Sequence, residues 1–333
     1  MSNTQTIGVI GAGAWGTALA QMLASDGRSV TLWAYEPEVV AAINAEHRNP
    51  LYLPNATLRP TIRATSDLGD IAGLDTVLGV TPAQVLGTIL SDLREAPHDL
   101  VLCSKGIEAG TGRLMNAVAR AACPGSAVAV LSGPTFAHEV ADGLPTAVTL
   151  ACSGGEAQWQ RLSPAIARPT FRPYYSDDVT GAEVGGAIKN VLAIACGVVE
   201  GLALGQNARA ALIARGMAEM LRFGAALGAR AETLSGLCGM GDLVLTCTST
   251  ASRNFSLGKA LGEGASAADL MADRTTVAEG AHTAPVLAKL AEERGIAMPI
   301  VAGVHAILEG AAAHDVVAQL LARPLKPEQE GAA

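Results

Sequence analysis

A glycine-rich turn directly after an apolar run near the N-terminus is the strongest constraint on the fold of this chain. Residues 7–10 lead into a G-x-G-x-x-G turn at residues 11–16, and residues 17–24 have the composition of a helix. A strand, a tight glycine turn and a helix in this order place a helix N-terminus against a pyrophosphate. The chain has 37 glycines, so the spacing alone is weak, but the flanking elements make it a dinucleotide-binding signature. We therefore expect Gly11, Gly13 and Gly16 to bind a cofactor.

The rest of the chain divides into a part rich in strands and a part rich in helices. Continuous apolar runs, typical of a parallel sheet buried on both faces, occur at residues 30–34, 76–80, 100–103, 127–131 and 147–150. Stretches of helical composition separate several of them, as at residues 83–93 and 114–121. The pattern predicts an α/β fold, with a Rossmann-like, doubly wound, mainly parallel sheet in residues 1–180 and an all-helical domain in residues 181–333.

Composition limits which classes of ligand, which cellular compartment and which relation to a membrane are expected. A net charge of -8 argues against nucleic acid as a partner but leaves room for a local basic pocket that holds a small phosphorylated molecule. Six scattered cysteines without a C-x-x-C pair, and no signal-peptide pattern, favour a cytoplasmic protein without a metal. Residues 184–204 are long enough to span a membrane, but Lys189 and Glu200 favour a buried helix instead.

Polar residues follow several predicted strands, where an open α/β sheet presents its ligand site. Lys105 comes directly after an apolar run, in Ser-Lys-Gly, and could meet a carbonyl or phosphate oxygen; a solvent-exposed loop lysine is the equal alternative. Lys189 lies among apolar residues just after Gly185-Gly186, so burial should lower its pKa toward the range useful for proton transfer. The competing interpretation is a salt-bridged core lysine.

Three later segments carry further polar groups. Asp242 stands between glycines and apolar residues, and either orients a nearby lysine or serves as a turn or capping carboxylate. Ser252, Arg253 and Asn254 offer a hydroxyl, a guanidinium and an amide suited to a phosphate dianion, although a surface loop is the alternative. Glu279 adds a carboxylate among small residues.

Taken together, these motifs resemble the bacterial-type NAD(P)-dependent glycerol-3-phosphate dehydrogenases. The segments occur in the family's order and extend over nearly the whole chain: GAGAWGTALA (11–20), SKG (104–106), LSGPTFAHEVA (131–141), GGAIKNVLAI (185–194), GMGDLVLTCTS (239–249), SRN (252–254) and VAEG (277–280). The resemblance implies reversible reduction of dihydroxyacetone phosphate to sn-glycerol 3-phosphate, which feeds glycerophospholipid synthesis.

The resemblance also implies roles for individual residues. Lys189 matches the family's acid/base, and Lys105 and Asp242 complete the implied catalytic set. The implied substrate contacts are Lys105, Gly133, Thr135, Lys189, Asp242, Ser252, Arg253 and Asn254. The implied cofactor contacts, besides the three fingerprint glycines, are Ala14, Trp15, Tyr35, Lys105, Ala137, Arg253, Val277 and Glu279.

The cofactor preference, the exact function and the assembly state stay open on the sequence. Family habit favours NADP(H), whereas Glu36 at the end of the second predicted strand would repel a 2′-phosphate and favours NAD(H). Position 14 is alanine, so any cofactor contact there is made by the backbone. Alternative functions are a 6-phosphogluconate or 3-hydroxyacid-type dehydrogenase and a non-catalytic dinucleotide sensor. The assembly state is undetermined, with a homodimer as one option.

Overall fold

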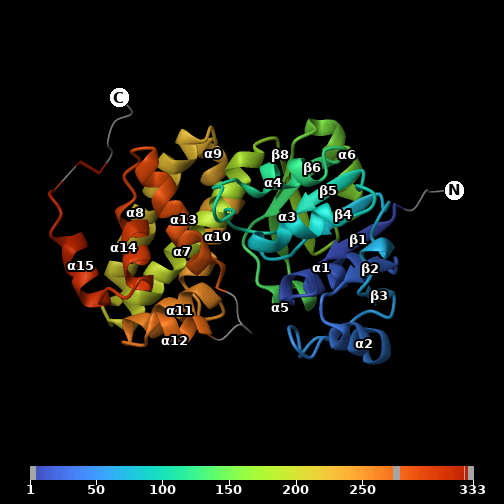
Figure 1. The fold of residues 1–333 in the computed structure, drawn as a ribbon, viewed down its shortest axis with the longest axis horizontal. Helices are drawn as coiled ribbons and strands as arrows, with labels where there is room; N and C mark the ends of the chain where they lie inside the picture. The colour runs from blue at the N-terminus through green and yellow to red at the C-terminus, as the bar shows by residue number, and fades with distance from the viewer. Residues whose placement is uncertain (1–4, 273–277, 326, 329–333) are drawn as a thin grey trace.

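The computed structural model describes residues 5–272, 278–325 and 327–328, and its first half is built on one eight-stranded sheet (Figure 1). The strand order is β3-β2-β1-β4-β5-β6-β7-β8, and neighbours pair in parallel except β6 and β7, which are antiparallel. The strands are β1 (Ile7–Ile10), β2 (Val30–Trp33), β3 (Ile62–Thr65), β4 (Thr76–Gly79), β5 (Asp99–Leu102), β6 (Ala127–Ser132), β7 (Thr146–Cys152) and β8 (Phe171–Ser176).

Helices cover both faces of the sheet and then form the second half of the molecule alone (Figure 1). Alternate residues of β5 show the two faces: Val101 packs into the core on one side, while Leu100 and Leu102 pack into the core on the other. The helices of the first half are α1 (Ala14–Leu23), α2 (Pro37–Glu46), α3 (Ala83–Ser91), α4 (Met115–Ala122), α5 (Ala137–Ala141) and α6 (Gly155–Ile166).

The second half contains only helices among its described residues. They are α7 (Val179–Gly201), α8 (Gly205–Ala226), α9 (Ala231–Leu234), the π-helical turn η3 (Leu237–Gly241), α10 (Asp242–Cys247), α11 (Arg253–Gly262), α12 (Ala267–Ala272), α13 (Glu279–Glu293), α14 (Pro299–Leu308) and α15 (Ala313–Leu321). The predicted fold class, a mainly parallel doubly wound sheet followed by helices, is confirmed.

Two strands were not predicted, and both lie at an edge of the sheet. β3 is only four residues long and exposes Arg63, so it lacks the continuous apolar run of a central strand. β8 contains Pro173 and the exposed Tyr174 and Tyr175, because one side of an edge strand remains open to solvent.

Helix α7 is the long apolar segment that the sequence predicts to be buried. It has the length and hydropathy of a membrane span, but it is enclosed on all sides by the protein. Every residue from Gly181 to Val199 is buried. The helix packs against β6 and β7 of the sheet and against α8, α10, α11, α13 and α14 of the helical half.

Helices α7 and α11 meet backbone to backbone through glycines. A Cβ built on Gly197 would overlap the carbonyl oxygen of Phe255, and one on Gly258 would overlap that of Ile194. Glycines four residues further along each helix, Gly201 and Gly262, continue the contact. Side chains would hold the two axes apart, so this contact fixes the start of α11 beside the middle of α7.

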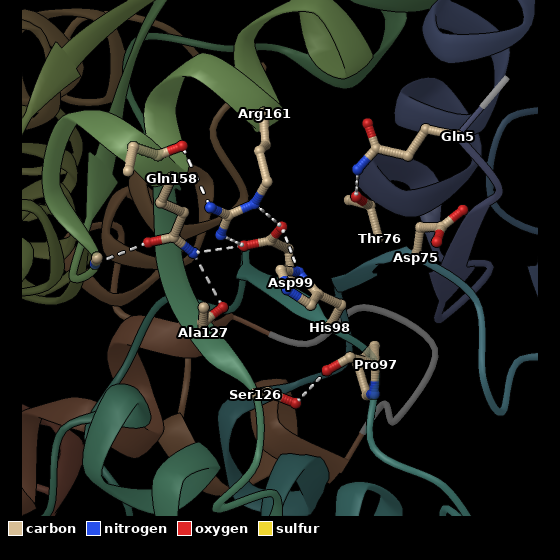
Figure 2. Close-up of polar contacts among 12 residues, drawn as sticks. Gln5, Asp75, Thr76, Pro97, His98, Asp99, Ser126, Ala127, Gln158 and Arg161 are labelled. Atoms are coloured by element: carbon tan, nitrogen blue, oxygen red, sulfur yellow. Dashed lines mark hydrogen bonds and ion pairs between the residues drawn. The ribbon is translucent and has the colours of Figure 1, made fainter. Parts of the chain in front are cut away.

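At the amino ends of the strands, a buried carboxylate joins the sheet to α6 (Figure 2). Asp99 is 0% exposed and accepts two bonds of 3.1 Å from the guanidinium of Arg161 and one of 2.9 Å from Gln158 Nε2. Gln158 also donates to the carbonyl oxygen of Ala127 at 2.9 Å. The carboxylate is therefore fully paired, and this end of the sheet serves the fold rather than a ligand.

Candidate functional site

The three fingerprint glycines have separate structural reasons. Gly11 has φ of 109°, in the left-handed region that favours glycine. A Cβ on Gly16 would overlap the carbonyl oxygen of Gly11, so only glycine lets α1 start so close to the turn. A Cβ on Gly13 would meet no atom within 4 Å, so the space in front of the helix is open.

This open space fits the pyrophosphate of a dinucleotide. Gly13 is the N-cap residue of α1, and it has no side chain that could accept a hydrogen bond from the first turn of the helix. The first N–H groups of α1, at Ala14 and Trp15, are those that a helix leaves without an internal partner, and they attract an anion. Position 14 contributes no hydroxyl, so the backbone supplies the donor there.

Two lysines and one aspartate form the centre of the site. Asp242 is 0% exposed; its Oδ2 lies 2.7 Å from Lys105 Nζ and its Oδ1 lies 2.8 Å from Lys189 Nζ. Lys105 follows β5, Lys189 lies in the middle of α7, and Asp242 is the first residue of α10. The structure therefore joins residues 137 positions apart in one charge cluster.

This geometry shows the burial and the ion-pair partner of both lysines. The side chain of Lys105 is only 16% exposed, so it is not a solvent-exposed loop lysine. Lys189 is salt-bridged and buried, as its competing interpretation held, but its partner also binds the second lysine at the ligand edge of the sheet. The N-cap of α10 is Gly241 rather than Asp242, and the carboxylate of Asp242 accepts hydrogen bonds from both ammonium groups.

The electrostatics of the cluster favour a lysine that can exchange its proton. Burial lowers the pKa of Lys189 to about 8; the charge of Asp242 opposes this shift and that of Lys105 adds to it. Burial acts to raise the pKa of Asp242, but the two ammonium groups hold it below its usual value. In the cluster the pKa of both Asp242 and Lys189 is thus lowered, that of Lys189 to about 8.

The sequence analysis did not single out two residues that complete the cluster. Thr246 Oγ1 accepts a bond of 2.9 Å from Lys189 Nζ, and Asn190 accepts one of 3.0 Å from Asn254 Nδ2. Thr246 follows Asp242 by one helical turn, and Asn190 is adjacent to Lys189. The i, i+4 spacing on a helix was the available signal for Thr246.

Gly185 and Gly186, which precede Lys189 in α7, admit protein atoms rather than a ligand. A Cβ on Gly185 would overlap the carbonyl oxygen of Cys238, in η3. A Cβ on Gly186 would lie 3.1 Å from Ser132 Oγ and 3.3 Å from Lys105 Cγ. These glycines let α7 approach the sheet edge closely enough for Lys189 to share Asp242 with Lys105.

The loop after β6 borders the cluster. The carbonyl oxygen of Gly133 lies 3.4 Å from Lys105 Nζ and also accepts a bond of 3.3 Å from Thr135 Oγ1. Ala137 is the half-buried first residue of α5, which packs against α1 of the glycine turn. The loop thus reaches from the lysines toward the predicted cofactor position.

The Ser252–Asn254 triplet opens helix α11 and is only partly free. Ser252 Oγ accepts from the N–H of Phe255 as the helix cap, at 3.3 Å. Asn254 is buried and bonds Asn190 and the N–H of Gly280. Arg253 is exposed, so its guanidinium is the group of the three best placed to meet a ligand. Burial raises the pKa of Glu279 to about 7, and Arg253 opposes that rise.

The remaining predicted cofactor residues lie beyond the end of β2, beside the glycine turn, or outside the described part of the chain. Tyr35 is 79% exposed just beyond β2. Trp15 packs against the core beside the glycine turn, and its Nε1 is buried without a partner among the described residues. Val277 lies outside the described residues.

Comparisons with known proteins agree over nearly the whole chain. Residues 6–158 match the model of the NAD-dependent glycerol-3-phosphate dehydrogenase N-terminus, and residues 178–319 match that of the C-terminus. Enzymes named glycerol-3-phosphate dehydrogenase [NAD(P)+] are 72% identical in Erythrobacter litoralis, over 98% of this chain and 99% of the relative, and 73% identical in Novosphingobium aromaticivorans, over 98% of each. The crystal structure of glycerol-3-phosphate dehydrogenase from Coxiella burnetii superposes with a TM-score of 0.91 at 40% identity, covering 96% of this chain and 99% of that one.

Proposed function

The chain belongs to the NAD-dependent glycerol-3-phosphate dehydrogenase family, and we propose that its Lys105–Asp242–Lys189 cluster carries out the family's reaction. The protein is an NAD(P)-dependent oxidoreductase that interconverts dihydroxyacetone phosphate and sn-glycerol 3-phosphate. The observation that supports this assignment of roles is the single buried carboxylate that holds two lysines from the two halves of the chain at the ligand edge of the sheet.

In this mechanism Lys189 is the acid and base. Its ammonium donates a proton to the carbonyl oxygen of the triose in reduction, and its neutral amine accepts the proton back in oxidation. Asp242 and Thr246 fix the direction of Lys189 Nζ through bonds of 2.8 and 2.9 Å. Lys105 keeps a second positive charge beside the oxygen, which stabilises the charge that develops there. The nicotinamide cofactor, when bound, supplies or accepts the hydride.

Substrate and cofactor contacts follow the same division of the molecule. Arg253, with Ser252 and Asn254 at the start of α11, would bind the phosphate, and Gly133 and Thr135 would border the triose. The cofactor would be held by Gly11, Gly13, Ala14, Trp15, Gly16, Tyr35, Lys105, Ala137, Arg253 and Glu279. Binding at the phosphate, away from the reacting carbon, contributes orientation at that carbon.

We also propose a cellular setting and an assembly state. We place the enzyme in the cytoplasm as a supplier of sn-glycerol 3-phosphate for glycerophospholipid synthesis, with a homodimer as the proposed assembly. A dehydrogenase for 6-phosphogluconate or a 3-hydroxyacid is disfavoured by the family matches over both halves of the chain. A non-catalytic sensor would have no need for the buried lysine pair.

The proposed phosphate contact is tested by comparing dihydroxyacetone phosphate with dihydroxyacetone in steady-state reduction. The purified protein should reduce the phosphorylated triose with a kcat/KM at least about a hundredfold higher, since charge-assisted bonds to a phosphate contribute about 1.5–3 kcal/mol each. Arg253→Ala should remove about tenfold or more of that advantage, mainly through KM. Arg94→Ala, an exposed arginine of the other half, is the matched control. Equal loss for both substrates would exclude a phosphate contact.

The pH profile follows from the lowered pKa of Lys189, about 8. Below this pKa the ammonium is present, so kcat/KM for triose reduction should be constant at acid pH and fall as pH rises through about 8. Oxidation of sn-glycerol 3-phosphate needs the neutral amine, so its kcat/KM should rise through the same region. Initial rates in both directions from pH 6 to about 10 measure this. Parallel profiles in the two directions would contradict the assignment of Lys189.

A further inference from the structure

Glu36, just beyond the carboxyl end of β2, pairs with Tyr52, which lies after α2. The proposed reaction uses neither side chain. The hydroxyl of Tyr52 donates to Glu36 Oε1 at 2.7 Å, and Tyr35 beside them is 79% exposed. Glu36 is the residue before α2, but its side chain makes no capping hydrogen bond. Its carboxylate is therefore directed to the tyrosine instead of the helix.

This pair is fixed relative to the glycine turn. The N–H of Gly11 donates to the carbonyl oxygen of Trp33, the last residue of β2, at 3.0 Å. The buried Asn49 donates from Nδ2 to the carbonyl oxygen of Ala12 at 2.8 Å, and its Oδ1 accepts from the N–H of Tyr52 at 3.1 Å. The segment carrying Tyr52 is thus tied to the turn that faces the pyrophosphate.

The end of the second strand is where dinucleotide folds of this type distinguish their two cofactors. A carboxylate there accepts a hydrogen bond from the 2′-hydroxyl of the adenosine ribose, whereas a 2′-phosphate requires a cation. In this chain, Tyr52 donates to one oxygen of Glu36, and no hydrogen bond to the other oxygen is found among the described residues. Burial, followed by the hydrogen bond to Glu36, raises the pKa of Tyr52 to about 12, so the phenol keeps its proton and remains a donor to Glu36.

We propose that Glu36, held in place by Tyr52, binds the adenosine ribose and makes this enzyme prefer NAD(H) to NADP(H). The inference rests on the proposed dinucleotide site, and it goes beyond the names of the similar enzymes, which give NAD(P)+ and so cover both cofactors. Tyr35 offers an exposed ring on which the adenine can stack. The competing group is Arg48, an exposed cation just past α2 that could instead bind a 2′-phosphate.

The test measures cofactor binding without substrate, by quenching of tryptophan fluorescence with NADH and with NADPH. The wild-type protein should bind NADH about tenfold or more tightly than NADPH, because a 2′-phosphate beside Glu36 loses a hydrogen bond and gains repulsion. Glu36→Gln should reduce this ratio about tenfold, chiefly by tightening NADPH. Tyr52→Phe should weaken NADH about threefold and leave NADPH weak, since the charge remains but loses its orientation.

Glu38→Gln is the matched control, because it removes one exposed carboxylate from the first turn of the same helix, and it should leave the ratio unchanged. The inference is overturned if the wild type binds NADPH at least as tightly as NADH, above all if Arg48→Ala abolishes that binding. It is also overturned if Glu36→Gln and Glu38→Gln change the ratio equally. Retained discrimination without triose reduction would refute the proposed function and leave this inference standing.

Discussion

Replacing Lys189 by alanine should lower kcat for triose reduction about a thousandfold while the affinity for the cofactor stays nearly unchanged. Loss of a positioned general acid costs about 10²–10⁴ in rate. The substitution removes the proton donor and leaves Asp242 paired with Lys105 alone, at 2.7 Å. No fingerprint glycine contacts Lys189 in the hydrogen bonds of the described residues, so the dinucleotide site remains intact.

A second variant separates chemistry from packing. Lys189→Met keeps most of the buried volume in α7 without an ionisable group, and it should be as inactive as Lys189→Ala but more stable. Lys289→Ala, which removes an exposed lysine at the surface of α13, is the control and should retain full activity. The measurements are kcat, cofactor affinity and Tm. Near-normal turnover in Lys189→Met would mean that another group donates the proton.

Replacing Gly258 by alanine should cost about 3 kcal/mol of unfolding free energy, because the added methyl group meets backbone that cannot move aside. Its Cβ would overlap the carbonyl oxygen of Ile194, with further α7 backbone atoms at 2.8 and 2.9 Å. Helix α11 would shift from α7, and the bond between Asn254 and Asn190 would lengthen. Activity should therefore fall together with stability.

Lys259→Ala is the control for Gly258→Ala. It tests whether the loss of stability comes from the α7–α11 contact or from any substitution in α11. Lys259 neighbours Gly258 on α11 but pairs only with Glu263 at the surface, and such pairs contribute little. The unfolding free energy of the Lys259→Ala protein should stay within about 0.5 kcal/mol of wild type. Urea unfolding followed by circular dichroism measures both variants. A Gly258→Ala protein as stable as Lys259→Ala would show that the α7–α11 contact yields easily.

The central strands, the glycine turn and the buried nature of α7 could be predicted because each follows from local pattern. β1 and β5 are continuous apolar runs, and a parallel sheet covered on both faces requires them. The edge strands β3 and β8 escaped because they mix exposed and buried residues. The division of the chain at residues 180 and 181 into separate domains stays a prediction.

The sequence indicated which residues belong to the candidate site, but not which of them contact one another. The sequence indicates that Lys105, Lys189 and Asp242 carry chemistry, yet not that one carboxylate binds both lysines, since the contact depends on how α7 approaches the sheet. The bond from Tyr52 to Glu36 could not be predicted either, because it depends on how the segment after α2 folds back against the glycine turn, where Asn49 bonds the carbonyl oxygen of Ala12. Local pattern specifies elements, whereas these pairs depend on tertiary packing.

Helix α7 has no solvent-facing stripe, and this has a consequence for how the two halves of the molecule can diverge. Helix α7, buried from Gly181 to Val199, packs against the sheet and against helices of the second half. A nucleotide-binding half that recombined with a different helical half would leave α7 mismatched on one side, and a substitution in α7 must suit both neighbours at once. We therefore expect the helix that bears Lys189 to couple the evolution of the two halves, because a change on either side of it must stay compatible with the other.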